Sequence, residues 1–151
     1  MATFFRIVQA QWAASAMTGE GARLYGGRWN PPGVAAIYLA DSRALAALEI
    51  IVNAPREVTS LQWRILEVEV SDDLVETVNA DDLPHDWQAL PSSPGARLHG
   101  GRCLKSGVLG FRLPSAVIPE EFTLLLNPLH PDFGKLRVSE PKIFRFDPRV
   151  T

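Results

Sequence analysis

Glycine and proline crowd residues 18–33, and no other feature restricts the fold of this chain so strongly. The segment holds five glycines and two prolines. Glycine permits positive φ angles and close backbone approach, and both residue types disfavour a helix or a central strand. The sequence therefore predicts a long loop over residues 18–33, followed by a buried strand over the apolar run 34–39.

The segment that follows this strand has the pattern of an amphipathic helix ending near Val52. Asp41 and Ser42 offer side-chain oxygens that can cap its first turn. Its apolar side chains recur at helical spacing, at Ala44, Leu45, Leu48 and Ile51. Asn53 and Pro55 end the pattern, because the residue before a proline is biased away from helical angles.

The remaining segments favour short strands over helices. Strands are predicted at residues 4–8, 61–70 and 122–126, with one or two more within 136–146. Other segments are a weak helix at 9–17, a strand or turn at 72–79, a polar and mobile surface excursion at 81–101, and a helix end or strand at 104–113. We therefore expect one α+β domain over residues 1–151 with a mixed, mostly antiparallel sheet.

Composition narrows the classes of function. The formal net charge of −2 gives no overall attraction to nucleic acid or to anionic lipid. No apolar run approaches the roughly 18 residues of a membrane-spanning helix, and the first residues do not resemble a signal peptide. Cys103 is the single cysteine, so an internal disulfide is excluded. The expected location is the cytoplasm, without a membrane or direct nucleic-acid partner.

Glu49 is the most unusual residue of the predicted helix, because a carboxylate stands between Leu48 and Ile50. One interpretation is an outward-pointing helix residue in solvent. Its position beside the apolar stripe favours another, in which it faces a cleft or meets a cation. An unpaired carboxylate buried in a protein costs several kcal/mol, so such a position favours a functional role.

Arg28 follows paired glycines in the sequence GGRWN, where backbone and guanidinium could approach one ligand together. Its planar fork suits phosphate or carboxylate, although a solvent-exposed turn arginine is the alternative. Tyr38, Ser115 and Asn127 have two possible interpretations each. Each could act in a functional site, or they could be, respectively, a core aromatic ring, a cap or turn residue, and a turn former. The loop lacks the glycine spacing of a Rossmann turn or a P-loop.

Other common chemistries have no support in the sequence. His85, His99 and His130 are far apart, and with one cysteine they offer no metal-ligand spacing. The serine elbow of the α/β-hydrolases is absent. Aromatic residues do not alternate with a basic run, which argues against nucleic-acid binding.

Three segments together resemble the RES domain family, the toxin component of certain bacterial toxin–antitoxin pairs. They are GARLYGGRWNPPG (21–33), IYLADSRALAALEIIV (37–52) and LPSAVIPEEFTLLLNPLHPDF (113–133), and the ending FRFDPRV is similar as well. The arginine, glutamate and serine that name the family fall on Arg28, Glu49 and Ser115.

This resemblance implies a fold like that of ADP-ribosyltransferase toxins, in which a split mixed sheet holds NAD in a cleft. It implies consumption of NAD by cleavage of the nicotinamide–ribose bond, by hydrolysis or phosphorolysis, with no metal. The implied catalytic residues are Arg28, Tyr38, Glu49 and Ser115. Binding of NAD would involve Gly27, Arg28, Trp29, Asn30, Tyr38, Ser115 and Asn127.

The resemblance also implies partners. A helix-turn-helix antitoxin would neutralise the enzyme and make any DNA contact, and a homodimer within that complex is a further expectation. Two alternatives remain open: transfer of ADP-ribose to a protein acceptor, and a non-catalytic binding module that has kept the fold. Glu49 separates the enzymes from the binding module, because only an enzyme requires its carboxylate.

Overall fold

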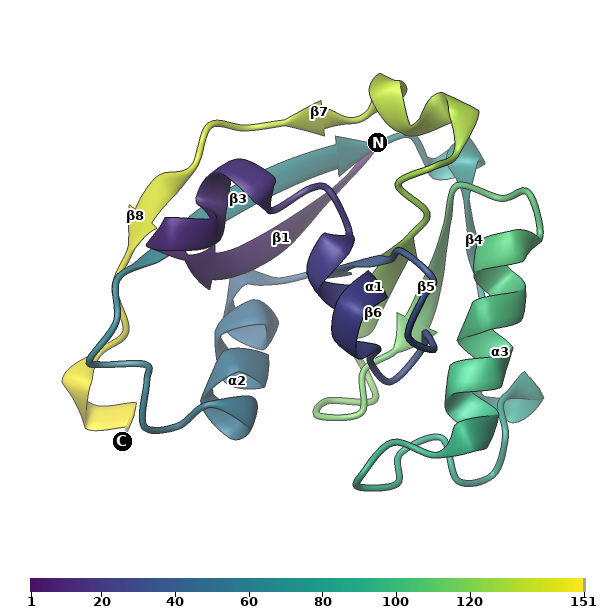
Figure 1. Cartoon of the computed structure of the whole chain (residues 1–151), viewed down its shortest axis with the longest axis horizontal. Coiled ribbons are helices and arrows are strands. Elements are labelled where there is room, and N and C mark those ends of the chain that lie inside the picture. Colours follow the sequence, from purple (N-terminus) through teal and green to yellow (C-terminus); the bar gives the residue numbers. More distant parts are fainter. Residues whose placement is uncertain (151) are drawn as a thin grey trace.

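The protein is built around an eight-stranded sheet, seen in a computed structural model that describes residues 1–150 (Figure 1). The strand order is β4-β5-β6-β2-β1-β3-β7, and β8 also pairs with β3. The strands are β1 (Ala2–Gln9), β2 (Ile37–Ala40), β3 (Trp63–Val70), β4 (Val75–Thr77), β5 (Gly110–Pro114), β6 (Phe122–Leu126), β7 (Arg137–Val138) and β8 (Lys142–Phe144).

Three α-helices and several 3₁₀ turns connect these strands. The α-helices are α1 (Glu20–Tyr25), α2 (Arg43–Asn53) and α3 (Pro94–Lys105). The 3₁₀ turns are η1 (Ala10–Ser15), η2 (Asp72–Leu74), η3 (Ala80–Asp82), η4 (Pro131–Lys135) and η5 (Pro148–Val150). None of the helices in residues 1–150 is long and apolar enough to cross a membrane.

The sheet divides at the seam between β1 and β2. All neighbouring strands are antiparallel except β4 and β5, so the expected mixed, mostly antiparallel sheet is confirmed. β1 is in register with β3 along its whole length, but it meets β2 only where Phe5 lies opposite Ala40. A second link crosses the seam, because Arg6 Nη1 donates a hydrogen bond to the Tyr38 carbonyl oxygen at 2.9 Å. Across the seam, the two halves of the sheet are therefore joined by one residue pair and one side-chain hydrogen bond.

α2 forms where the sequence predicts it and packs beside the seam. The Ser42 hydroxyl caps the helix by accepting a hydrogen bond from the Leu45 amide at 3.0 Å. Leu45 and Ala46 are buried in a cluster with the β1 side chains Phe5 and Ile7. This packing fixes the side of α2 that faces the seam.

α1 corrects the prediction of an uninterrupted loop over residues 18–33. Glu20–Tyr25 is helical, and both flanking glycines, Gly19 and Gly26, have φ of 74°. These glycines lie at the ends of the helix rather than inside it, where their positive φ angles cost little because glycine has no Cβ. Glu20 and Arg23 form an ion pair across one turn, which supports the short helix.

α3 corrects the interpretation of residues 81–101 as a polar surface excursion in its last part, from Pro94 onward. Its first turn is capped by Ser93, whose hydroxyl accepts a hydrogen bond from the Ala96 amide at 3.0 Å. Ala96 and Leu104 on its inner side are buried. Gly100 packs so closely that a Cβ there would lie 1.9 Å from the Trp29 carbonyl oxygen. α3 is thus the wall against which the glycine-rich loop rests.

Candidate active site

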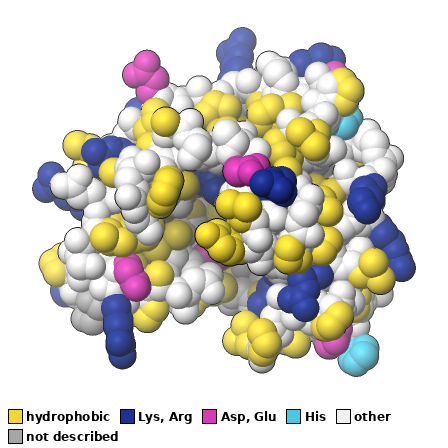
Figure 2. All heavy atoms as spheres, viewed as in Figure 1, with side chains coloured by type: hydrophobic (Ala, Val, Ile, Leu, Met, Phe, Trp, Pro, Cys, Tyr) yellow, Lys and Arg dark blue, Asp and Glu magenta, His cyan; other side chains and the backbone are white. Residues whose placement is uncertain are grey.

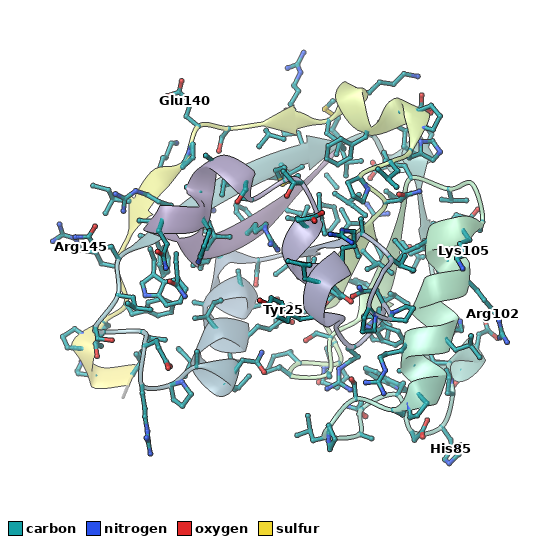
Figure 3. All side chains as sticks on the ribbon, in the orientation of Figure 1. Tyr25, His85, Arg102, Lys105, Glu140 and Arg145 are labelled. Atoms are coloured by element: carbon teal, nitrogen blue, oxygen red, sulfur yellow. The ribbon has the colours of Figure 1, made fainter. Side chains whose placement is uncertain are left out.

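A cleft of about 860 Å³ opens beside the seam of the sheet. In Figure 1, α1 lies in front of the sheet between α2 and α3, and these elements contribute to the walls of the cleft or support them. Tyr25 at its mouth is 83% exposed and is labelled in Figure 3, and Leu90 is 86% exposed. Figure 2 shows hydrophobic side chains spread over the middle of this face. The cleft thus has an apolar mouth, and its lining mixes apolar side chains with the charged side chains of Arg6, Arg28 and Glu49.

Glu49 projects from α2 into this cleft, as the interpretation of a cleft-facing carboxylate requires. Its Oε1 accepts hydrogen bonds from Ser115 Oγ at 3.1 Å and Thr123 Oγ1 at 3.4 Å. Burial raises the pKa of Glu49, although these two hydroxyls and the nearby Arg28 oppose the rise. Oε2 accepts no hydrogen bond from the described residues, so it is the oxygen that a ligand can use.

Ser115 reaches Glu49 from behind rather than lining the cleft. Its side chain is buried immediately after β5. While its hydroxyl donates to Glu49, it accepts hydrogen bonds from the amides of Val117 at 3.1 Å and Ile118 at 3.3 Å. This arrangement fixes the Glu49 carboxylate in one orientation.

Tyr38 connects β2 to the loop that carries Arg28. Its Oη donates a hydrogen bond to Asn30 Oδ1 and accepts one from the Trp29 amide at 3.1 Å. Burial raises the pKa of Tyr38 far above its ordinary value. A Cβ at Gly27 would lie 2.7 Å from this hydroxyl, so the glycine leaves room for it. Tyr38 therefore lines the cleft with its hydroxyl already occupied.

Asn30 and Trp29 support the loop from its buried side. Asn30 is fully buried, and its Nδ2 donates to the carbonyl oxygens of Ala22 at 2.8 Å and Val34 at 2.9 Å. Trp29 stacks on Trp87 with ring centroids 6.1 Å apart and also borders the cleft. Asn30 does not line the cleft; its Nδ2 is bonded to the backbone and its Oδ1 to the Tyr38 hydroxyl.

Asn127 lies elsewhere and does not line the cleft. Its Nδ2 donates to the Leu104 carbonyl oxygen at 3.2 Å, and its Oδ1 accepts from the Leu129 amide at 3.0 Å. These contacts join the end of β6 to the end of α3. The structure gives Asn127 the turn-forming position that was the alternative in the sequence.

Arg28 enters the cleft from the glycine-rich loop. Its Nη1 donates to the carbonyl oxygens of Trp87 at 2.8 Å and Ala89 at 2.9 Å, so it also holds the segment before α3. Partial burial lowers the pKa of Arg28, and the charge of Glu49 opposes this. Nε and Nη2 make no hydrogen bond with the described residues, and they can meet a ligand.

Arg6 is the site residue that the sequence reasoning missed. It lines the cleft from β1, its Nε is buried without a partner, and it forms no ion pair within residues 1–150. Burial also lowers the pKa of Arg6, because it removes water from around the charged guanidinium. The available signal was a cation in the apolar strand sequence FFRIV, an anomaly of the same kind as Glu49 in its helix.

The cleft therefore combines two guanidinium groups with one carboxylate that has a free oxygen. Arg6 is a buried cation that forms no ion pair within residues 1–150, which is costly, so it favours an anionic ligand. Arg28 adds two nitrogens that are free to bind the same ligand. Residues 1–150 contain no group of three or more histidine, cysteine, aspartate or glutamate side chains placed to hold a metal. The arrangement suits an anionic substrate with a centre of developing positive charge close to Glu49.

Comparison with known proteins gives close relatives over the whole chain. Toxin Res of Yersinia enterocolitica is 39% identical over 148 residues, covering 97% of each chain. The Prs ADP-ribosylating toxin of a Sphingobium species is 35% identical over 154 residues, covering 98% of this chain and 96% of the relative.

A third relative, MbcT of Mycobacterium tuberculosis, is named NAD(+) phosphorylase and matches a shorter segment. It is 41% identical over 69 residues, which are 45% of this chain and 35% of MbcT. The crystal structure of the MbcT–MbcA toxin–antitoxin complex superposes with a TM-score of 0.79 at 24% identity, over 95% of this chain and 84% of that one. The expected fold, ADP-ribosyltransferase-like, is thereby confirmed.

The sequence pattern of the RES domain matches residues 3–147. This span contains Arg6 and all four residues expected to be catalytic, and the structure gathers these five in and directly behind one cleft. The chain therefore belongs to the RES domain family.

Proposed function

We propose that this protein is the toxin of a toxin–antitoxin pair and that it consumes NAD by cleaving the nicotinamide–ribose bond. One observation carries this proposal: Glu49 offers one free carboxylate oxygen to a cleft that also holds two guanidinium groups. The names of the relatives support it, since one is an NAD(+) phosphorylase and others are toxins. The proposed activity belongs to a single domain acting in the cytoplasm.

The chemistry suits a carboxylate in this setting. As the bond between ribose C1′ and the nicotinamide nitrogen breaks, positive charge builds on the ribose ring, and the bonding electrons leave with neutral nicotinamide. Glu49 Oε2 stabilises this charge and orients the ribose hydroxyls. Water then forms the new bond to C1′ and releases a proton to solvent, giving ADP-ribose, or phosphate forms the bond through an anionic oxygen and gives the 1-phosphate. No metal is needed for these steps.

Both arginines of the cleft are proposed to bind the anionic part of NAD. Arg6 brings an uncompensated charge, and Arg28 keeps two nitrogens free while Nη1 holds the segment before α3. Both suit the pyrophosphate, because guanidinium forks match phosphate oxygens. Tyr38 offers its ring to the nicotinamide, and Ser115 positions Glu49.

The direct test is a turnover assay with product identification. Purified protein is incubated with NAD, with and without phosphate, and the products are separated by liquid chromatography and mass spectrometry. We expect free nicotinamide with ADP-ribose in water and its 1-phosphate when phosphate is the acceptor. A folded protein that leaves NAD intact under both conditions would refute the proposal.

ADP-ribosyl transfer to a protein is the second candidate, and one relative is named for that activity. The same residues would break the same bond, and the apolar mouth at Tyr25 and Leu90 could receive an acceptor protein. Labelled NAD added to a cell extract separates the two candidates. Label that stays on protein after denaturing electrophoresis supports transfer, whereas label only on small products supports degradation.

We further propose a helix-turn-helix antitoxin as partner, with a toxin homodimer inside their complex. The support is the toxin–antitoxin complex of MbcT, whose fold this chain shares. Co-expression with the product of the neighbouring reading frame should restore growth and NAD levels. Copurification of both chains, followed by light scattering, measures the composition of the complex.

A further inference from the structure

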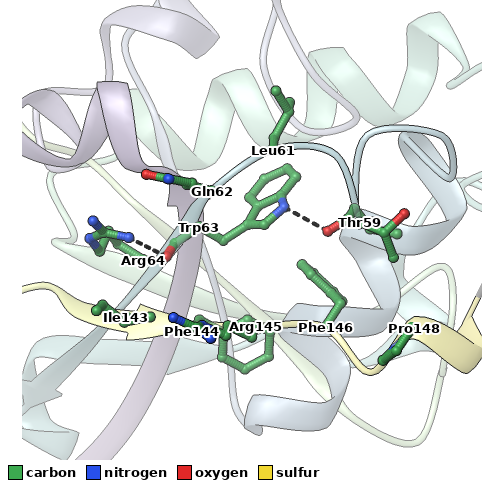
Figure 4. A pocket seen from close by; sticks show the side chains of 11 residues that line it. Thr59, Leu61, Gln62, Trp63, Arg64, Ile143, Phe144, Arg145, Phe146 and Pro148 are labelled. Carbon is green, nitrogen blue, oxygen red and sulfur yellow. Dashed lines mark hydrogen bonds between the residues drawn. The ribbon is translucent and has the colours of Figure 1, made fainter.

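A second hollow lies on the other side of the α2 segment, outside the cleft described above (Figure 4). Its volume is about 480 Å³, and its lining comes from two parts of the chain. One part is the turn after α2 and the start of β3, residues 58–59 and 61–64, and the other is β8 with the residues that follow it, residues 143–146 and Pro148. The proposed NAD chemistry uses none of them.

The floor of this hollow is a fixed aromatic cluster. Trp63 packs edge-on against Phe146 with ring centroids 5.6 Å apart, and Phe144 does the same at 5.1 Å. Trp63 is 5% exposed, and its indole Nε1 donates a hydrogen bond to the Val58 carbonyl oxygen at 3.1 Å. Figure 4 shows the Trp63 ring in the middle of the hollow, with the phenylalanines on the segment across from it. The floor is therefore formed before any partner binds.

The rim of the hollow is cationic. Arg64 and Arg145 both line it, and no aspartate or glutamate does. Neither arginine, nor the adjacent exposed Lys142, belongs to an ion pair within residues 1–150. The positive charge at this rim is therefore local, because the net charge of the whole chain is −2.

Apolar side chains and a sheet edge accompany this charge. Ile143 is 64% exposed on β8, and Leu61 is 38% exposed on the facing turn. β8 pairs only with β3 among the described strands, so its outer backbone edge is open. An open edge with an apolar hollow beside it is the geometry in which an extended segment adds to a sheet.

Charge decides between the kinds of extended segment that could bind. Two copies of this chain joined through their β8 edges would bring Lys142 and Arg145 of both copies together, and like charges across strands are destabilising. An acidic segment would instead neutralise the arginines. We propose that this hollow is a docking site for an extended acidic segment of a partner protein, with one apolar side chain inserted over Trp63.

A labelled peptide measures this directly. The probe is a fluorescein-tagged synthetic peptide of alternating glutamate and leucine, titrated with full-length protein and followed by fluorescence anisotropy. We expect saturable binding that weakens with added salt, because exposed charges are screened. The Trp63 indole proton resonance should shift during the same titration, since its ring forms the floor.

Two control peptides separate charge from apolar contact. A lysine–leucine peptide keeps the apolar side chains, and a glutamate–serine peptide keeps the charge. Both should bind at least about tenfold more weakly than the probe. Equal binding of all three peptides, or no binding of the probe, would refute the docking site.

Variants locate the binding. Arg64→Glu and Arg145→Glu should each weaken the probe by about tenfold, whereas Arg102→Glu on the exposed side of α3 makes the same charge change elsewhere and should not. Thermal unfolding and NAD turnover check that each variant is folded. Unchanged affinity in both rim variants would contradict the proposal, as would a concentration-dependent dimer that either rim variant dissociates.

Discussion

At the scale of single residues, the site depends on the environment of one carboxylate. Burial raises the pKa of Glu49, so the folded protein holds this proton to a higher pH than the unfolded chain. Where the native state binds more protons, stability falls as pH rises. This fall occupies the window between the ordinary glutamate pKa and the raised one, and above it the buried charge is a constant cost.

Replacing Glu49 by glutamine tests this balance. The amide oxygen can still accept from Ser115 and Thr123, but the buried charge is gone. We expect Glu49→Gln to unfold at the same or a higher temperature than the parent protein at neutral pH, while NAD cleavage falls by about 10²- to 10³-fold. In the parent protein, activity should rise with pH through the raised pKa, because the ionised carboxylate is the working form. A pH-independent parent rate from pH 4 to 8 would contradict this assignment.

Ser115 acts through Glu49, and its replacement should move the pH profile. The serine hydroxyl favours the ionised carboxylate and opposes the effect of burial on the pKa of Glu49. Ser115→Ala should therefore shift the acidic limb of the rate profile to higher pH and lower the maximal rate. Ser115→Thr, which keeps the hydroxyl, should restore the position of that limb. A lower rate with an unmoved limb would mean that Ser115 serves only the fold.

Arg6 forms no ion pair within residues 1–150, and its Nε is buried without a hydrogen-bond partner. Arg6→Gln should raise the KM for NAD by about 10-fold or more, because a charge-assisted contact to phosphate is lost. The rise in melting temperature on adding ADP-ribose should shrink in the same variant. Arg43→Gln removes a guanidinium from an exposed ion pair outside the cleft and provides the control.

At the scale of elements, Gly100 lets α3 approach the loop of Arg28 closely. A Cβ at Gly100 would lie 1.9 Å from the Trp29 carbonyl oxygen, so the helix or the loop must move. We expect Gly100→Ala to lower the free energy of unfolding by about 1–3 kcal/mol or more and to reduce NAD cleavage as well. Gly21→Ala in α1 is the control for stability alone, since Gly21 lines the cleft: nothing lies within 4 Å of its Cβ, and alanine favours a helix. Chemical denaturation of both variants measures the difference.

The elements also show where sequence reasoning reached its limit. The strand at 122–126 and the helix ending near Asn53 were predicted almost to the residue, because their apolar periodicity and caps are local signals. Only the end of α3 was anticipated, by the helix end or strand expected over 104–113. Its body was missed, because its glycines at 100 and 101 weaken the helical pattern and its buried side is revealed only by the loop that packs on it. Tertiary contact, not propensity, decides that segment.

The site divides in the same way. Glu49 could be identified because a carboxylate in an apolar helix is conspicuous, and the family resemblance gave Arg28, Tyr38 and Ser115. That the Tyr38 hydroxyl is occupied by Asn30 depends on how a loop folds back onto a strand. No spacing in the sequence encodes such a contact.

At the scale of the whole molecule, the seam between β1 and β2 determines where we expect the sheet to open locally. Amides at the middle of a sheet ordinarily exchange most slowly, but here the central pair of strands meets only at Phe5 and Ala40. We expect the Ala40 amide to exchange with solvent faster than amides of β6, where the pairing with β5 and β2 is continuous. Hydrogen exchange followed by NMR measures both, and slower exchange at the seam than in β6 would contradict this.

The position of Arg6 gives this seam a further meaning. Arg6 stands on β1, whereas Arg28 and Tyr38 belong to the half of the sheet that begins with β2, so a substrate held by both arginines would bridge the two halves. A bound substrate would link the two halves reversibly. Amide hydrogen exchange should therefore slow along the seam more than elsewhere in the sheet. Each turnover would then cut this link and leave the enzyme looser than its substrate complex. The unliganded toxin would be its most easily unfolded form.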